Sequence, residues 1–181
     1  MAEPERSETE VKLRAESVES ARRLIRGLGA FLAQPRHFED NLVFDDEGGG
    51  LSGRSCLLRL RTTPTGNTVT FKGARAVIEG VKRREEIECR VDDAETLRAI
   101  LEKLGLRVAF RYQKYREVYE WEEVEIVIDD TPIGVFIEIE GAVADIHETA
   151  EALGFGAESY VVESYAALFF AEGGRGDMVF A

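Results

Sequence analysis

Eight stretches of the chain alternate apolar and polar residues. Such period-two alternation predicts β-strands, because successive side chains of a strand point to opposite faces of its sheet. Turn signals at residues 64–67 and 131–134 separate neighbouring stretches and favour hairpins. We therefore expect strands at residues 8–14, 37–45, 56–62, 68–73, 83–91, 106–119, 123–129 and 133–141.

Four other stretches repeat apolar residues every three or four positions, which is typical of helices with one buried face. They predict helices at residues 17–28, 93–104, 145–153 and 158–171. Many strands with few helices indicate an α+β domain built on a large antiparallel sheet or barrel. We expect residues 1–172 to form this single domain. Residues 173–181 lack periodicity and are expected to be a flexible tail.

Charged residues gather on one face of the predicted strands, and the opposite face is almost entirely aliphatic. An open antiparallel sheet with one wet face would show the same alternation. In a closed barrel with the charges inside, the bases would instead converge on one axis, which is costly unless they bind a polyanion and a metal. The charged face carries six carboxylates and seven bases: Glu8, Glu10, Glu86, Glu88, Glu138, Glu140, Lys12, Arg59, Arg61, Lys72, Arg84, Lys114 and Arg116.

The first predicted strand carries Glu8, Glu10 and Lys12 on one face, each about 7 Å from the next. Two carboxylates beside a lysine could hold a hard divalent cation next to an anionic substrate, although a solvated edge strand would look the same. A second acidic group, Glu122, Glu123 and Glu125, flanks a turn near Trp121. We interpret this group as a solvated loop.

Composition restricts the partners of the chain. Its 181 residues carry a net charge of −12, which argues against affinity for nucleic acid or an anionic membrane. No secretory signal or apolar span is visible, so we expect a soluble, cytoplasmic protein. Cys56 and Cys89 lie inside predicted strands and are expected to be buried thiols. With two histidines, any metal should have oxygen ligands, which indicates Mg²⁺ or Mn²⁺.

These motifs, taken in order, resemble those of the CYTH superfamily, the triphosphate tunnel metalloenzymes. The defining Glu-x-Glu-x-Lys of that family matches Glu8, Glu10 and Lys12. Further similar segments follow along most of the chain, at residues 27–30, 38–45, 58–61, 70–73, 84–88, 114–116, 128–129, 134–140 and 164–165. One position departs from the pattern, because similar proteins often carry a base where this chain has Glu163.

The resemblance implies a closed eight-stranded antiparallel barrel, a triphosphate tunnel with a charged interior and flanking helices. It also implies roles for the charged residues. Lys12 would orient the phosphate or assist proton transfer. The metal would be held by Glu8, Glu10, Glu88, Asp129, Glu138 and Glu140. The triphosphate would be bound by Arg59, Arg61, Lys72, Arg84, Lys114 and Arg116, because arginine forks suit phosphate oxygens.

The family chemistries share in-line phosphoryl displacement. The resemblance favours a class IV adenylyl cyclase, which converts ATP to cyclic AMP and pyrophosphate. A triphosphatase acting on tripolyphosphate, thiamine triphosphate or a nucleoside triphosphate is the alternative. A non-catalytic polyphosphate-binding or nucleotide-binding module is a third hypothesis, against which the carboxylate pairs argue. A homodimer is compatible with the resemblance.

Overall fold

The computed structural model describes residues 7–181. Its strands are β1 (Ser7–Ala15), β2 (Phe31–Asp46), β3 (Leu57–Thr63), β4 (Gly66–Lys72), β5 (Ala76–Ile78), β6 (Val81–Val91), β7 (Leu106–Trp121), β8 (Val124–Thr131) and β9 (Gly134–Glu140). Its α-helices are α1 (Val18–Gly27), α2 (Ala94–Lys103), α3 (Val143–Ala152) and α4 (Tyr165–Ala171). Two short 3₁₀ turns span Ser52–Arg54 and Ala157–Ser159.

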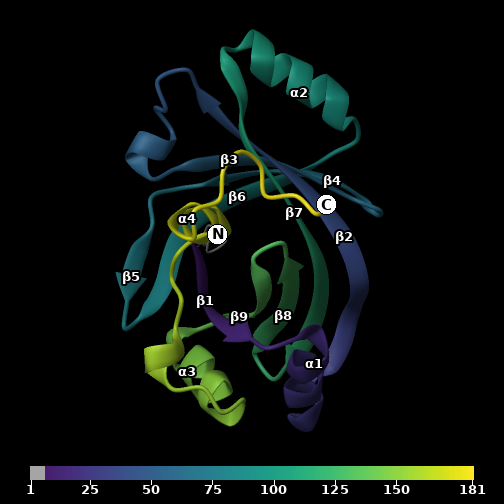
Figure 1. The fold of residues 1–181 in the computed structure, drawn as a ribbon, viewed down its shortest axis with the longest axis vertical. Coiled ribbons are helices and arrows are strands. Elements are labelled where there is room, and N and C mark those ends of the chain that lie inside the picture. The colour runs from purple at the N-terminus through teal and green to yellow at the C-terminus, as the bar shows by residue number, and fades with distance from the viewer. Residues whose placement is uncertain (1–6) are drawn as a thin grey trace, which may run out of the picture.

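The strands form one closed antiparallel barrel (Figure 1). The order β1-β9-β8-β7-β2-β3-β4-β6 returns to its start because β6 also pairs with β1. In that closing pair Glu8 lies opposite Arg84 and Glu10 lies opposite Lys82. Strand β5 pairs with β6 outside this ring. The expected eight-stranded barrel is therefore confirmed, with one additional short strand.

Apolar side chains on the outside of the barrel form the core with the helices. Ser17 caps the start of helix α1, where Ser17 and Ser20 each accept a hydrogen bond from the other's backbone amide. The helix buries Ile25. Ile25 and Ile146 of α3 belong to one cluster with the outward side chains of β1, β8 and β9. Helix α2 packs against β3 and β7 at the opposite end (Figure 1). The charged face of each barrel strand therefore points into the barrel. No helix within residues 7–181 is long and apolar enough to cross a membrane.

The helix expected at residues 158–171 is shorter in the structure. Only Tyr165–Ala171 is α-helical, and Ser164 caps it by accepting the amide proton of Ala167 at 3.2 Å. Before it, Val161 forms a β-bridge with Lys12 of β1. Two adjacent valines favour an extended backbone, and this pairing outweighs the helical period.

The segment after Glu172 was expected to be flexible, but the structure packs it against β7. Met178 accepts a hydrogen bond from the backbone of Gln113 at 2.9 Å and donates one to Arg111 at 3.0 Å. Its side chain is 1% exposed, and the ring of Phe180 lies 5.3 Å from that of Tyr115. The segment around Met178 is short and is held by its pairing with β7, so its own sequence shows no periodic pattern that predicts this structure.

The expectation of two buried thiols was wrong. Cys56 is half-buried and Cys89 is exposed. Cys89 lies on the outer face of β6, where Ile87 is also exposed, because the helices pack against other strands.

Replacing Met178 with alanine should lower the free energy of unfolding by about 2–3 kcal/mol, because the deletion leaves a cavity. Urea unfolding measures this loss. Val179→Ala is the matched control, since that side chain is exposed and should change stability by less than about 0.5 kcal/mol. A Met178→Ala protein as stable as the parent would show that the terminal segment does not stay packed.

Candidate active site

The barrel encloses a cavity of about 620 Å³ lined by acids and bases from most of its strands. Of the residues predicted to form the site, Asp129 is the one that does not line this cavity. The other twelve do: Glu8, Glu10, Lys12, Arg59, Arg61, Lys72, Arg84, Glu88, Lys114, Arg116, Glu138 and Glu140. The alternation along each strand explains this convergence, because one face of each barrel strand points inward.

Four carboxylates share one wall, formed by the neighbouring strands β1 and β9. Glu10 lies directly opposite Glu140, and Glu138 lies opposite Lys12. Burial and the charge of Glu10 raise the pKa of Glu8 to about 8. Burial and the charges of Glu10 and Glu125 raise the pKa of Glu140 to about 7. These carboxylates repel one another, which is the arrangement that a divalent cation relieves.

The donor set of this wall is all oxygen, which fits Mg²⁺ or Mn²⁺. Within residues 7–181, however, no three acidic, histidine or cysteine side chains are arranged to hold a metal as they stand. Lysine side chains form ion pairs with these carboxylates instead. Lys12 Nζ lies 2.6 Å from Glu10 Oε1, Lys72 Nζ lies 2.5 Å from Glu8 Oε2, and Lys82 also contacts Glu10. A cation on this wall would therefore replace lysine contacts.

Lys12 lies between the two pairs of carboxylates. Its Nζ is 2.6 Å from Glu10 and 3.2 Å from Glu138. Burial lowers the pKa of Lys12, but Glu10 and Glu138 outweigh it and raise that pKa above its usual value. Lys12 thus holds its proton, which suits charge neutralisation and positioning of an anion better than proton abstraction.

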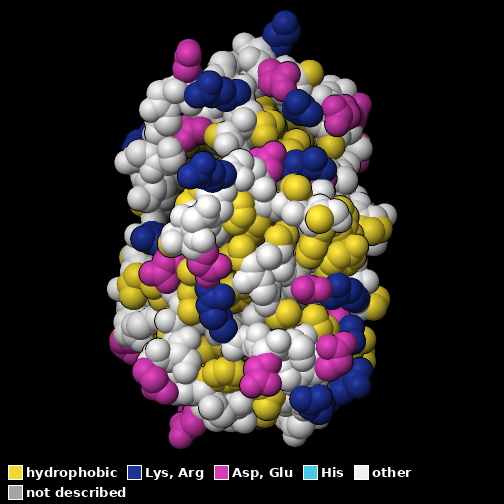
Figure 2. Space-filling view, viewed as in Figure 1, with side chains coloured by type: hydrophobic (Ala, Val, Ile, Leu, Met, Phe, Trp, Pro, Cys, Tyr) yellow, Lys and Arg dark blue, Asp and Glu magenta, His cyan; other side chains and the backbone are white. Residues whose placement is uncertain are grey.

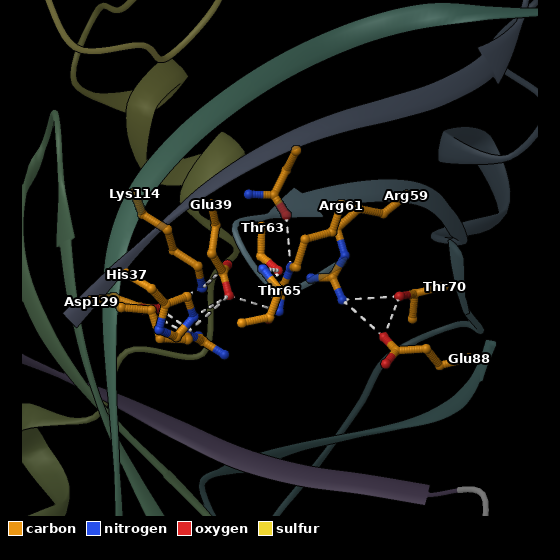
Figure 3. A network of polar contacts seen from close by, with 12 residues as sticks. His37, Glu39, Arg59, Arg61, Thr63, Thr65, Thr70, Glu88, Lys114 and Asp129 are labelled. Carbon is orange, nitrogen blue, oxygen red and sulfur yellow. Dashed lines mark hydrogen bonds and ion pairs between the residues drawn. The ribbon is translucent and has the colours of Figure 1, made fainter. Parts of the chain in front are cut away.

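Arginines and a lysine of β3 and β7 also line the cavity, and Figure 3 shows three of these bases, Arg59, Arg61 and Lys114. Arg59 donates to Thr70 at 3.1 Å, and its Nε is a buried nitrogen without a hydrogen-bond partner in the structure. Arg61 donates to Asn41 at 3.0 Å and lies 3.1 Å from Glu39. A buried guanidinium nitrogen without a partner could donate a hydrogen bond to a phosphate oxygen.

Asp129 holds two of the bases, Lys114 and Arg116. It accepts hydrogen bonds from Lys114 at 2.7 Å, from Arg116 at 2.6 and 2.7 Å, and from Tyr165 at 2.8 Å, and it is fully buried. With both oxygens engaged, Asp129 positions the bases in this structure. Glu88 is also separate from the carboxylate wall, since it lies four residues, or about 13 Å, along β6 from the position opposite Glu8.

Arg84 points toward backbone carbonyls. It donates to the carbonyl of Gly73 at 2.9 Å and to those of Lys72 and Ser55 at 3.0 and 3.1 Å. It therefore ties the end of β4 to the loop before β3 while lining the cavity.

Several residues of the barrel interior were not among the site residues predicted from the sequence. Lys82 lies one residue before the strand expected at residues 83–91, so it was not counted among the inward residues of β6. Glu39 lies among Arg61, Lys114 and Arg116, and Tyr112 follows the same period as Lys114. Glu125 was interpreted as part of a solvated loop; its side chain is exposed, but it lies within β8, opposite Glu140.

Comparisons with known proteins place the chain in a family. The CYTH domain matches residues 6–165. The chain belongs to the CYTH domain family. A Methanocaldococcus jannaschii protein, named as a proposed adenylate cyclase, is 31% identical over 147 residues, which cover 81% of this chain and 83% of that protein. This membership confirms the resemblance found in the sequence.

Two solved structures of other proteins show the same fold. A Vibrio parahaemolyticus protein, described as a proposed adenylate cyclase, superposes with a TM-score of 0.80 at 16% identity, over 90% of this chain and 97% of its own. A Hippeastrum protein, described as a proposed adenylyl cyclase with a dominant triphosphatase activity, superposes with a TM-score of 0.67 at 21% identity, over 93% and 97%.

Replacing Asp129 with asparagine should lower the free energy of unfolding by about 3–5 kcal/mol, because it leaves buried bases without their carboxylate. Urea unfolding measures this loss. Asp130→Asn is the matched control, since the Asp130 pair with Arg36 is partly exposed and should contribute about 1 kcal/mol or less. Equal stability of the two variants would mean that other acids compensate for Asp129.

Tyr112 should ionise at a lower pH than an ordinary tyrosine. Burial raises the pKa of Tyr112, but the charges of Arg59, Arg61 and Lys114 outweigh it and lower that pKa to about 8. An ultraviolet titration should therefore show one tyrosinate forming near pH 8, and Tyr112→Phe should remove it.

Tyr160→Phe is the control for this titration, because burial raises the pKa of Tyr160. Tripolyphosphate should shift the early ionisation to higher pH, since bound negative charge disfavours the phenolate. An early step that survives in Tyr112→Phe would contradict the assignment.

Proposed function

We propose that the chain is a divalent-cation-dependent enzyme that acts on a triphosphate inside the barrel. One observation carries this proposal: four carboxylates on β1 and β9 line the same cavity as a group of bases. Binding alone would need the bases but not two pairs of carboxylates. The family assignment agrees with the expectation of an enzyme, since its members named above are a proposed cyclase and a protein with triphosphatase activity.

In this proposal the bases bind and orient the phosphates. Arg59 and Arg61 supply planar donor groups from β3, and Lys114 and Arg116 supply charge from β7. The carboxylates Glu8, Glu10, Glu138 and Glu140 would hold Mg²⁺ or Mn²⁺. That cation would polarise phosphate oxygens and offset charge that develops on them. Lys12, which keeps its proton between Glu10 and Glu138, would neutralise the phosphate nearest the wall.

The favoured reaction is that of a class IV adenylyl cyclase. The ribose 3′-hydroxyl of ATP loses its proton to solvent as its oxygen attacks the α-phosphorus. A new P–O bond forms, the bond between the α-phosphorus and the bridging oxygen of the β-phosphate breaks, and pyrophosphate leaves with that bond's electrons. The name of the Methanocaldococcus jannaschii relative supports this assignment.

A triphosphatase is the second candidate. There, water attacks the terminal phosphorus and orthophosphate is released. The activity described for the Hippeastrum protein favours it, because that protein combines a cyclase-like fold with triphosphatase activity. The two reactions use the same bases and differ in which phosphorus is attacked.

A product assay with ATP, tripolyphosphate and thiamine triphosphate, each with Mg²⁺ or Mn²⁺, separates the candidates. We expect cyclic AMP and pyrophosphate from ATP. Orthophosphate without cyclic AMP would establish the triphosphatase instead. No turnover of any of the three would contradict both and support the binding module.

The variant for this assay is Glu140→Gln. Within residues 7–181 Glu140 forms no ion pair, and burial and the neighbouring carboxylates raise its pKa, so its neutralisation should not disturb the fold. Loss of a cation ligand should lower activity by about 100-fold or more, with partial recovery at higher cation concentration. Glu123→Gln, on the exposed turn after β7, is the control.

A further inference from the structure

Tyr112 lies among the bases of the cavity. On β7 it is two residues from Lys114, and its partner on β2, Asn41, is paired on the other side with Arg61 of β3. Its side chain lines the cavity, and its hydroxyl accepts a hydrogen bond from Arg59 Nη1 at 3.4 Å. The hydroxyl is therefore surrounded by bases that come from two strands.

The proton of this hydroxyl has no acceptor in the described part of the chain. Among residues 7–181 the Tyr112 hydroxyl accepts one hydrogen bond and donates none. The Nε of its neighbour Arg59 is also a donor without a partner. Buried donors of this kind are groups that an oxygen of a ligand can satisfy. Two adjacent side chains thus offer unused donors in the same part of the cavity.

The ring of Tyr112 is fixed by packing. It lies 6.0 Å from the ring of Phe110, and it belongs to one apolar cluster with Met178 and with Tyr165 of α4. Hydrophobic side chains gather across the middle of this face, in the region of α4 (Figure 2). Since its ring is held in this way, the hydroxyl should keep its place when a ligand enters.

Positive charge dominates the surroundings of Tyr112. Arg59 and Arg61 of β3 and Lys114 of β7 outweigh burial and lower the pKa of Tyr112 to about 8. The titratable groups nearby on the other elements are engaged within the protein: Glu39 of β2 with Arg61, Tyr165 of α4 with Asp129, and Asp177 of the terminal segment with the amide of Arg111.

We propose that the Tyr112 hydroxyl is a further substrate-binding group, which donates a hydrogen bond to a phosphate oxygen held by Arg59 and Arg61. This inference rests on the proposed function, because it requires a phosphate at those arginines. The hydroxyl donates only while it keeps its proton, and a phenolate in its place repels the phosphate. Substrate binding therefore weakens as the pH rises through the pKa of Tyr112.

The test is the pH dependence of Kd for tripolyphosphate, measured by calorimetry on the parent and on Tyr112→Phe. At pH 7 the variant should bind about tenfold more weakly, because one hydrogen bond to a charged group is lost. At pH 9.5 it should bind as tightly as the parent or more tightly, because only the parent then carries a phenolate. Tyr115→Phe is the matched control, since Tyr115 is on the same strand but does not line the cavity, and it should follow the parent at both pH values.

The comparison isolates Tyr112, because ionisation of the tripolyphosphate and of the cavity carboxylates affects both proteins. Equal Kd values for parent and Tyr112→Phe at both pH values would overturn the inference. The same loss of affinity at both pH values would also overturn it, since a purely structural effect does not depend on the phenolic proton. If the parent binds neither tripolyphosphate nor ATP at pH 7, the proposed function fails and the inference fails with it. Binding by the parent without a change in the order of the two Kd values refutes the inference alone.

Discussion

Buried charge is tolerated in this barrel because acids and bases face one another across short distances. Lys114 and Arg116 contact Asp129, Lys12 contacts Glu10 and Glu138, and Lys72 lies 2.7 Å from Glu86. Desolvating any one of these charges alone would be costly. The bases are thus not free. A triphosphate would have to exchange with carboxylates, and a cation bound to those carboxylates would release lysines. In the proposed enzyme, cation and substrate would therefore assist one another's binding.

Much of the barrel and its interior could be predicted from the sequence. The alternation of Glu8, Glu10 and Lys12 determined which side chains share a face, and family resemblance indicated that the sheet closes. The contacts of Asp129 with Lys114 and Arg116 could not be predicted, because a strand pattern specifies a face but not a partner. Lys82, opposite Glu10, was missed for a different reason. Its strand begins two residues before the expected boundary.

Local periodicity failed where distant pairing decides the backbone. Val161 lies in a stretch with helical spacing, yet it bridges to Lys12 of β1. Met178 lies in a segment without any period, yet it pairs with β7. The exposed thiol of Cys89 has a related cause, since alternation identifies the outer face of a strand but not whether a helix covers it. Each case needs the tertiary arrangement, which short-range patterns do not contain.

Strand β1 stands almost at the beginning of the described chain, yet both of its neighbours in the barrel come much later, from residues 81–91 and 134–140. During synthesis, β1 therefore waits without a partner at least until β6 has left the ribosome. Closing such long loops makes folding slow, and unpaired strand edges are prone to aggregation. Its alternating charges suit this interval, because Glu8, Glu10 and Lys12 keep the waiting strand hydrated and discourage association with other nascent chains.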